Sequence, residues 1–364
     1  MGTALPTRDL DGRWLVLDEP AADAFDQIES FLAAHRGLPA DLYLGYGLAG
    51  GGPPEPCPLP AAACRIVTGE RATLGSDPVV ARYTVGAWER TWTAEQHRAA
   101  VEEARAAIGR GDVYQVNLVQ HMRAPFQGDP AGVERALSPL GAEFAGAMHG
   151  DGWSIVSATP ELFLRTRGDR VWTMPIKGTR PADSTEPIAA SGKDRAEHVM
   201  IVDLERNDLG RVCVPGSVRV STFLEERPMA GVRHLVSTVE GRLRPGVGTA
   251  ELLRATFPGG SITGAPKLAA IEHIARLEPV GRGASMGAIG RVHPNGDLDL
   301  GLTIRTFAIA AGEIHLWVGG GIVWDSDPGE EVEESLVKAR PLLRRLSAGA
   351  GDPRDGGMRI AARG

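Results

Sequence analysis

The stretch GAIGRVHPNGDLDLGLTIRTFAIAAGEIHLWV, residues 287–318, decides the fold class. Asn295-Gly296 is a strong signal for a two-residue hairpin turn, and apolar runs flank it at 287–293 and 298–310. A third apolar run follows at 314–318. Consecutive strands joined by short turns pair antiparallel, so the stretch predicts three neighbouring strands of an antiparallel sheet.

Helices and further strands surround this stretch without a strand–helix–strand repeat. Alternating or apolar runs predict strands at 42–48, 114–120, 154–164 and 171–176. The run 114–120 alternates, which predicts a half-buried strand with Gln115 and Asn117 on its polar face. Helices are predicted at 23–34, 191–204, 252–257, 267–277 and 330–346, and Thr93 with Gln96 forms a capping box for another helix that Gly109 and Gly111 end. The mixture predicts an α+β architecture with large antiparallel sheets rather than a doubly wound fold.

Composition excludes several classes of protein. The 364 residues include 39 Lys and Arg against 46 Asp and Glu, for a net charge of −7 and a pI near 5.8. This acidic balance argues against nucleic acid or an anionic membrane as the main partner. The 47 glycines and 26 prolines make up a fifth of the chain without a fixed period, which favours many short strands and loops.

The cysteines and the apolar stretches bear on location. Cys57, Cys64 and Cys213 are an odd number without a CxxC pair, so neither a disulfide framework nor a zinc site is expected. The N-terminus lacks the apolar core of a signal peptide, and the longest apolar stretch, 307–324, is interrupted by charged and glycine residues. These features predict a cytoplasmic protein with reduced thiols.

Two acidic helices carry candidate metal ligands. Glu331, Glu334 and Lys338 stand at i, i+3 and i+7 on one helical face, and Asp194 with Glu197 stands at i, i+3 in the first turn of another helix. Carboxylates from two helices could converge on Mg²⁺, which prefers oxygen ligands. The alternative is a solvated acidic face with a surface Glu334–Lys338 pair.

Three cationic or titratable side chains interrupt apolar runs. Lys177 follows an apolar strand and precedes a Gly-Thr turn; burial there favours the neutral amine, a nucleophile, whereas a lysine that reaches solvent is the alternative. Arg305 lies inside the predicted strand 302–308 and needs a planar anionic partner, from the protein or from a substrate. His234 is ambiguous in the same way, and a lone histidine is more often structural than catalytic.

Two glycine-rich segments could hold an anion. FPGGSITGAPK, residues 257–267, contains Thr263 and leads small residues and hydroxyls into a helix N-terminus, but it lacks the Gly-Lys-Ser/Thr ending of a P-loop. The run Gly319-Gly320-Gly321 would allow close approach of a ligand to the backbone. For both segments the alternative is ordinary turn chemistry.

Nine segments, taken in order, resemble the chorismate-utilising enzymes. This family includes anthranilate synthase component I, aminodeoxychorismate synthase component I, and isochorismate and salicylate synthases. The segments span roughly residues 85–345 and are YQVNL, ATPELFL, PIKGTR, KDRAEHVMIVDLERNDLGRV, HLVSTVEG, FPGGSITGAPK, GAIGRV, IRT and GGGIVWDSDPGEEVEES. The resemblance implies two large stacked antiparallel sheets flanked by helices, with the active site in a cleft. It divides the chain into a short N-terminal portion packed on the main sheet (1–85), a chorismate-binding catalytic region (86–347) and a disordered tail (348–364).

Two positions discriminate within the family. Anthranilate synthases carry alanine where this chain has Lys177, and the Pro-Ile-Lys-Gly-Thr form looks like that of aminodeoxychorismate synthases. Isochorismate and salicylate synthases carry a lysine where this chain has Gln115, and that lysine serves as the base for an attacking water. A glutamine cannot deprotonate water, so hydration of chorismate is disfavoured.

The resemblance also assigns roles to single residues. It implies that Lys177 attacks the ring, that Glu161 is the general acid for the leaving hydroxyl, and that His234 lies near the reacting ring. The remaining roles are Mg²⁺ ligands, at Glu197, Glu331 and Glu334, and substrate-binding positions, at Thr179, Arg305, Lys338, Gly319, Gly320, Gly321, Gln115 and Thr263.

The implied reaction joins chorismate and ammonia to give 4-amino-4-deoxychorismate, for 4-aminobenzoate and folate or for a specialised metabolite. Anthranilate synthesis and a non-catalytic chorismate-binding scaffold are the alternatives. None of the three cysteines lies in a Gly-x-Cys-x-Gly elbow, so ammonia is expected from a separate glutaminase subunit. Two departures from the family pattern stand out: Ser285 replaces an aromatic residue, and no Leu-Leu-Glu-Ser segment is recognisable, so tryptophan inhibition is not expected.

Overall fold

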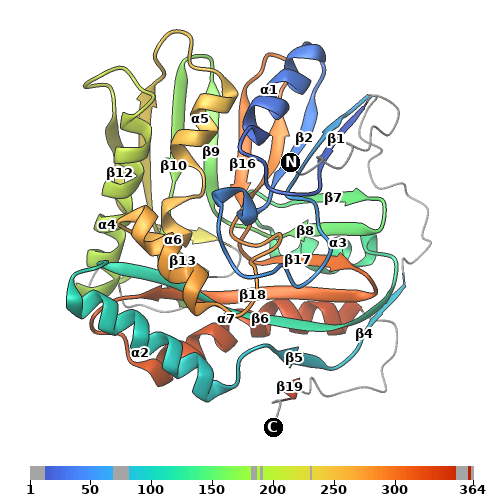
Figure 1. Cartoon of the computed structure of the whole chain (residues 1–364), viewed down its shortest axis with the longest axis vertical. Helices are drawn as coiled ribbons and strands as arrows, with labels where there is room; N and C mark the ends of the chain where they lie inside the picture. The colour runs from blue at the N-terminus through green and yellow to red at the C-terminus, as the bar shows by residue number, and fades with distance from the viewer. Residues whose placement is uncertain are drawn as a thin grey trace, which may run out of the picture.

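Two antiparallel β-sheets with helices around them make up the fold, as predicted (Figure 1). The computed structural model describes residues 13–68, 82–181, 187–188, 192–229, 232–349 and 360–361; within these ranges the side chains at 179–181, 193–194, 229 and 360–361 are not described. In this part of the chain ten strands form the larger sheet and nine the smaller one.

The larger sheet has the strand order β1-β3-β2-β15-β16-β9-β10-β13-β11, with β12 also paired to β13. Its first three strands come from the N-terminal portion, which therefore forms one edge of this sheet. Its strands are β1 (Trp14–Leu17), β2 (Ala40–Leu44), β3 (Ala62–Ile66), β9 (Leu162–Arg167), β10 (Arg170–Met174), β11 (Ile176–Pro181), β12 (Arg219–Met229), β13 (Val232–Arg242), β15 (Ala288–Val292) and β16 (Leu298–Leu302).

The smaller sheet has the order β19-β5-β6-β18-β17-β8-β7, and β4 and β14 also pair with β6. Its strands are β4 (Tyr83–Val85), β5 (Trp88–Arg90), β6 (Gln115–Gly128), β7 (Gly146–Gly150), β8 (Trp153–Ser157), β14 (Gly264–Ala265), β17 (Thr306–Ala310), β18 (Glu313–Ile322) and β19 (Ile360–Ala361). The predicted tail lies mostly outside the described residues; its described part is the end of the last helix and β19, which pairs parallel with β5.

Seven α-helices are described, and the capping box predicted at Thr93 is present. The Gln96 N–H donates to the Thr93 hydroxyl and the Gln96 side chain accepts from the Thr93 N–H, while Gly111, with φ 83°, ends the helix. The helices are α1 (Ala24–Ala34), α2 (Ala94–Arg110), α3 (Ala131–Leu137), α4 (Gly192–Gly210), α5 (Thr249–Thr256), α6 (Lys267–Leu277) and α7 (Pro328–Gly349). Short 3₁₀ turns lie at Tyr46–Ala49, Ser138–Leu140 and Gly260–Ile262.

The two faces of the smaller sheet have different partners. Met122 of β6 and Leu316 of β18 belong to a hydrophobic cluster with Leu342 of α7. On the opposite face, Trp317 belongs to the main core, which also contains Leu300 of the larger sheet. Side chains at alternate positions of β6 and β18 therefore point either to α7 or inward, toward the larger sheet.

Two predicted strands each prove to be two strands in different sheets. The run 154–164 divides into β8 of the smaller sheet and β9 of the larger, and the run 298–310 divides into β16 of the larger and β17 of the smaller. Arg305 was predicted inside a strand; it lies instead in the second crossing, with φ 52°. A continuous apolar pattern hides such crossings, because both sheets bury the same kind of side chain.

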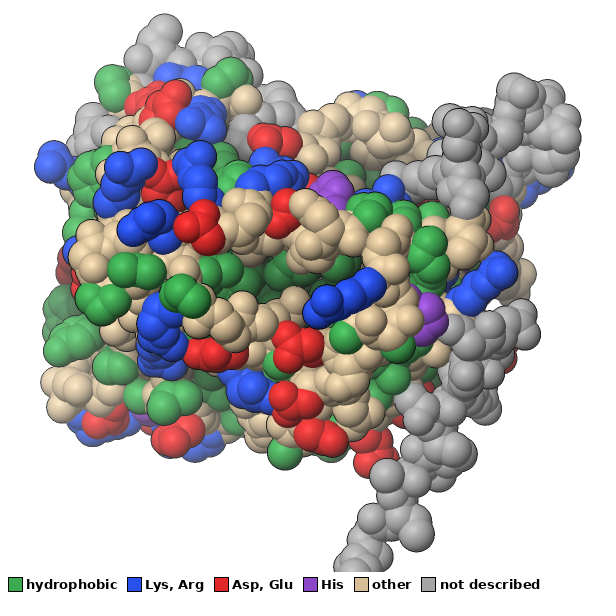
Figure 2. Space-filling model, turned by 90° about the horizontal axis from the view of Figure 1, so that it is seen from above, with side chains coloured by type: hydrophobic (Ala, Val, Ile, Leu, Met, Phe, Trp, Pro, Cys, Tyr) green, Lys and Arg blue, Asp and Glu red, His purple; other side chains and the backbone are tan. Residues whose placement is uncertain are grey.

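Seen from above the view of Figure 1, the molecule is hollowed across its middle, with hydrophobic side chains in the hollow and charged ones around it (Figure 2). No helix in the described part of the chain is long and apolar enough to span a membrane.

Candidate active site

The two crossings between the sheets lie side by side. The Ala158 N–H donates to the Arg305 carbonyl at 3.1 Å, and the Leu302 N–H donates to the Glu161 carbonyl at 2.9 Å. These backbone bonds pair Arg305 with Ala158 and Glu161 with Leu302, so the two crossings run antiparallel to each other. The charge of Arg305 acts on the Glu161 carboxyl, and the two side chains therefore lie within electrostatic reach. The sheet topology thus joins two side chains that are far apart in the sequence.

Glu161 is a buried acid whose carboxylate is held from two sides. The Ser261 hydroxyl donates to its Oε1 at 2.5 Å, and the Ile176 N–H also donates to the carboxylate. Burial raises the pKa of Glu161 to about 7, although the Ser261 hydrogen bond, the positive charge of Lys177, the Ile176 hydrogen bond and Arg305 all act to lower it. An acid of this strength can give up a proton near neutral pH.

Lys177 lies on β11 where the pairing with β13 changes register, between Lys177 and Arg180. The adjoining Gly178 has φ 63°, a conformation that residues with a side chain rarely adopt. The Lys177 Nζ donates to the backbone carbonyl of Ser261 at 3.2 Å. Ser261 therefore contacts both groups: its carbonyl accepts from the lysine amine and its hydroxyl donates to Glu161.

His234 of β13 connects this group to Arg305. Arg305 can only donate, so the His234 Nε2, which lies 3.4 Å from its Nη2, accepts; the His234 Nδ1 then donates to the Gly178 carbonyl at 2.9 Å. Burial lowers the pKa of His234 to about 4 against the raising effect of the Gly178 bond, and Arg305 and Lys338 lower it further. His234 is therefore neutral at pH 7, and it orients the guanidinium.

A second set of predicted residues meets at β18 and α7. The Lys338 Nζ donates to the Gly319 carbonyl at 2.8 Å and pairs with Glu334 Oε1 at 2.7 Å. A Cβ placed on Gly320 would lie 3.4 Å from Glu334 Oε1 and 3.5 Å from Glu331 Oε2. Because Gly320 has no side chain, a space remains there, and it is bordered by the carboxylates of Glu331 and Glu334 and the amine of Lys338.

The predicted metal ligands are only partly placed together. In the described ranges, no group of three or more His, Cys, Asp or Glu side chains is arranged to hold a metal ion. Glu197 is half-buried on α4, and the Asp194 side chain is outside the described part. Glu331 and Glu334 provide two carboxylates, which fit Mg²⁺ because this ion usually takes one or two protein carboxylates and completes its shell with water and substrate oxygens.

Three further predicted residues have different surroundings. Gln115 is fully buried on β6, and its strand is buried on both faces here rather than half-buried as predicted. The Thr263 hydroxyl donates to the carbonyls of its own loop, at 3.0 and 3.2 Å. Thr179 lies on β11, but its side chain is not among those described.

The loop 257–267 positions Ser261 rather than presenting a bare helix end. The Lys267 Nζ donates to the Pro258 carbonyl at 2.6 Å and pairs with the buried Asp208 of α4 at 2.5 Å. Ser261 lies in the 3₁₀ turn Gly260–Ile262, and β14 separates this turn from the start of α6. Sequence reasoning did not single out Ser261: its hydroxyl was visible in the motif, but its partner Glu161 is 100 positions away.

A second acid lies close to the site and was not predicted. Glu205 of α4 is buried and accepts a hydrogen bond from the Thr173 hydroxyl at 3.0 Å. Burial and the neighbouring Glu161 raise the pKa of Glu205 well above its usual range. Two buried carboxyl groups near one another cannot both ionise cheaply, so ionisation of one group favours the protonated form of the other.

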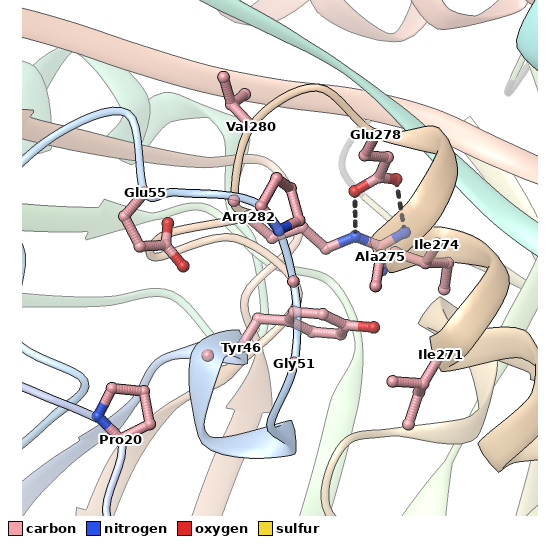
Figure 3. A pocket seen from close by; sticks show the side chains of 14 residues that line it. Pro20, Tyr46, Gly51, Glu55, Ile271, Ile274, Ala275, Glu278, Val280 and Arg282 are labelled. Atoms are coloured by element: carbon pink, nitrogen blue, oxygen red, sulfur yellow. Dashed lines mark hydrogen bonds and ion pairs between the residues drawn. The ribbon is translucent and has the colours of Figure 1, made fainter.

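Arg282 is a buried residue that holds the loop next to Ser261 in place. It forms a two-point ion pair with Glu278, at 2.7 and 2.8 Å, and donates to the carbonyls of Ile262 and Asn117, both at 2.8 Å. Its guanidinium lies over the Tyr46 ring in the wall of a pocket of about 210 Å³ (Figure 3). Neither Lys177 nor Glu161 lines this pocket.

Ser285, where the resemblance led us to expect an aromatic residue, is fully buried and donates to the Thr303 carbonyl at 3.3 Å. Its hydroxyl therefore holds the first residue of the crossing at 303–305. This contact gives Ser285 a structural role on the larger-sheet side of the site.

The fold and these groups define a class of protein: two stacked antiparallel sheets with a buried acid, a lysine amine and an oriented arginine between them. The chain belongs to the chorismate binding enzyme family, whose sequence model matches residues 70–344. This result confirms the family predicted from the nine segments.

Two relatives show how close the similarity is. The chain is 42% identical over 281 residues to aminodeoxychorismate synthase component 1 of Klebsiella aerogenes, covering 74% of this chain and 62% of that protein. It is 40% identical over 277 residues to anthranilate synthase component 1 of Streptomyces coelicolor, covering 72% and 54%. The chain thus spans little more than half the length of these relatives.

A solved structure confirms the fold. The crystal structure of anthranilate synthase component I from Streptococcus pneumoniae TIGR4 matches with a TM-score of 0.77 over 93% of this chain and 94% of that one, at 24% identity. At that identity the similarity concerns the fold alone.

Proposed function

We propose that this protein converts chorismate and ammonia to 4-amino-4-deoxychorismate, as an aminodeoxychorismate synthase component 1. The observation that supports the proposal is that Lys177 and Glu161 both form hydrogen bonds with Ser261. Overall identity does not separate the two activities, because relatives with both names are about equally similar. Lys177 favours aminodeoxychorismate synthesis, because the family resemblance places an alanine at this position in anthranilate synthases.

The first stage forms a bond between Lys177 and the substrate ring. The Lys177 amine, in its deprotonated form, attacks C2, the ring double bonds shift, and the C4–O bond breaks. Glu161, with a pKa raised to about 7, supplies the proton with which the hydroxyl leaves as water. The stage ends with a protonated secondary amine on C2 and an ionised Glu161.

The second stage releases the lysine. Ammonia attacks C4, the double bonds shift back, and the C2–N bond breaks, so that Lys177 leaves as a neutral amine. The new ammonium group at C4 gives one proton to Glu161, which restores the acid. The sum is chorismate plus ammonia to 4-amino-4-deoxychorismate plus water, and both protein groups return to their initial states.

Other residues orient the substrate. Arg305, held by His234, offers a planar pair of donors to a carboxylate, and Lys338 offers an amine beside Gly319. Glu331 and Glu334, with Glu197 as a third candidate, would hold Mg²⁺ in this proposal. When bound, the ion would neutralise the charge of the ring carboxylate.

Ammonia is proposed to come from a separate glutaminase subunit. All three cysteines are buried and free, and burial raises the pKa of Cys64 to about 12, that of Cys213 to about 11, and that of Cys57 beyond its usual range. Buried thiols of this kind are poor nucleophiles, so none fits a glutaminase site. Free thiols also suit a reducing compartment, and we propose a cytoplasmic location.

Product analysis tests the proposal. Purified protein with chorismate, Mg²⁺ and ammonium chloride should give 4-amino-4-deoxychorismate, and 4-aminobenzoate once an aminodeoxychorismate lyase is added. Lys177→Ala should abolish this product. Anthranilate fluorescence as the main signal would instead support the alternative that the 40% identity to an anthranilate synthase suggests, and binding without turnover would indicate a scaffold.

A further inference from the structure

The pocket that Arg282 borders is separate from the reacting groups, since neither Lys177 nor Glu161 lines it (Figure 3). Its walls come from the N-terminal portion, at Pro20 and between 46 and 55, and from α6 and the segment after it, between 271 and 282. Its volume is about 210 Å³. An apolar cavity of roughly 150 Å³ binds benzene, whereas drug-sized ligands occupy larger pockets. The pocket therefore has room for one aromatic ring with a short side chain.

Two polar groups in the pocket wall have hydrogen-bonding capacity that the described residues do not use. Glu55 accepts from the Gly283 N–H through Oε2, at 2.7 Å, and its Oε1 has no hydrogen-bond partner in that part of the chain. The buried Tyr46 hydroxyl has none there either. The Glu55 carboxylate lies on one side of the pocket, and the Tyr46 hydroxyl lies on the other and points toward Ile271 (Figure 3). Buried polar atoms normally have partners, so a ligand with a polar atom at each end fits this wall.

The charges that border the pocket favour a cationic ligand. Glu55, Glu278 and Arg282 are the charged residues in its lining. The two-point ion pair between Glu278 and Arg282 neutralises both, so the Glu55 carboxylate leaves one net negative charge. It attracts an ammonium group and repels a carboxylate. Ile271 and Ile274 of α6 add apolar surface, which suits the body of such a ligand.

Arg282 connects this pocket to the candidate active site. Besides its ion pair with Glu278, it donates to the Ile262 carbonyl at 2.8 Å, and Ile262 directly follows Ser261. Ser261 contacts both reacting groups. A ligand in the pocket therefore lies against the residue that holds the active-site loop.

We propose that this pocket is an effector site for a small organic ammonium compound that has an apolar body and a hydroxyl group. The ammonium group pairs with Glu55, the hydroxyl group bonds to Tyr46, and the body lies against α6. Occupancy fixes Arg282 and thereby alters how the loop of Ser261 meets the substrate. The effect on chorismate rests on the proposed function, whereas binding of the ammonium compound does not.

Calorimetric titration with tyramine, an aromatic ammonium compound with a hydroxyl group, tests the binding site. Tyramine should bind at pH 7, and 3-(4-hydroxyphenyl)propanoate, in which a carboxylate replaces the ammonium group, should not. Glu55→Gln should weaken tyramine binding about tenfold or more, the effect of losing a hydrogen bond to a charged group. The matched control is Glu272→Gln, which removes the same charge from an exposed position of α6 outside the pocket lining and should leave the affinity unchanged.

Tyr46→Phe tests the second polar contact. Because the substitution removes only a buried hydroxyl without a partner, it should not lower the free energy of unfolding of the ligand-free protein. In the wild type, tyramine should bind about fivefold more tightly than 2-phenylethylamine, which lacks the hydroxyl group. In Tyr46→Phe the two compounds should bind equally. If Glu55→Gln does not fold, judged by circular dichroism, this comparison decides.

The effector role has its own measurement. The affinity for tyramine should change twofold or more when chorismate and Mg²⁺ are present, because two coupled sites affect one another reciprocally. No binding of tyramine, or equal binding to the wild type and to folded Glu55→Gln, overturns the site. Tyramine binding that chorismate does not alter overturns the effector role. A protein that binds tyramine but makes no aminodeoxychorismate refutes the proposed function and leaves the binding site standing.

Discussion

Removing the Ser261 hydroxyl should move the pH dependence of the first chemical stage in a direction that the structure fixes. The hydroxyl donates to Glu161 at 2.5 Å and so favours the carboxylate. Without it the pKa of Glu161 rises from its value of about 7. Since the protonated acid is the active form, Ser261→Ala should extend activity to higher pH. A hydrogen bond to a charged group contributes about 1.5–3 kcal/mol, which corresponds to a midpoint about one to two pH units higher.

The assay follows formation of the Lys177 adduct from chorismate without ammonium, by rapid quenching and mass spectrometry between pH 6 and pH 9. Leaving out ammonium removes the titration of ammonia itself from the profile. Ser261→Ala keeps the backbone carbonyl that accepts from Lys177, so the amine stays in place. Ser285→Ala is the matched control, because its hydroxyl is equally buried but donates to the Thr303 carbonyl.

The expected result is an alkaline midpoint near pH 7 in the wild type and in Ser285→Ala, and a higher one in Ser261→Ala. A midpoint that is unchanged or lower in Ser261→Ala would refute the reasoning, because the acid would then be some group other than Glu161. A lower rate at every pH with the midpoint unmoved would refute it in the same way, and would leave the hydroxyl only a role in positioning the substrate.

Three other substitutions follow from the same contacts. Glu161→Gln should be inactive yet more stable than the wild type at pH 8. Because the pKa of Glu161 is raised in the folded state, its contribution to stability is complete below pH 4.5 and is lost as the pH rises to about 7. At pH 8 the substitution should therefore increase the free energy of unfolding, measured by chemical denaturation, by at most about 3 kcal/mol. Lys267→Met leaves Asp208 buried without its ion-pair partner and should cost about 3–5 kcal/mol of unfolding free energy, measured in urea. Gly321→Ala should displace the Gln115 side chain and lower turnover without unfolding the protein, which thermal denaturation alongside the kinetics would verify.

Much of the fold was predictable because the strongest local signals coincide with the observed elements. The capping box at Thr93 starts α2, and the helix predicted at 267–277 is α6. The crossings at 158–161 and 303–305 were not predictable from periodicity, because β16 and β17 continue one apolar pattern while belonging to different sheets. Arg305 was recognised as needing an anionic partner, but only the two paired crossings show how it comes within electrostatic reach of Glu161.

The burial of the two amide side chains of β6 is a functionally relevant feature that the sequence alone did not predict. Alternation correctly separates Gln115 and Asn117 from Val116 and Leu118, and it predicts one polar and one apolar face. A single strand cannot reveal that its polar face points at a second sheet, so the amides were expected at a half-buried surface. The structure buries them and leaves three of their polar atoms without a protein partner. A polar side chain costs little at a surface, but burying it without a hydrogen-bond partner costs free energy. Buried amides that keep no protein partner are therefore the strongest physical reason to expect a ligand.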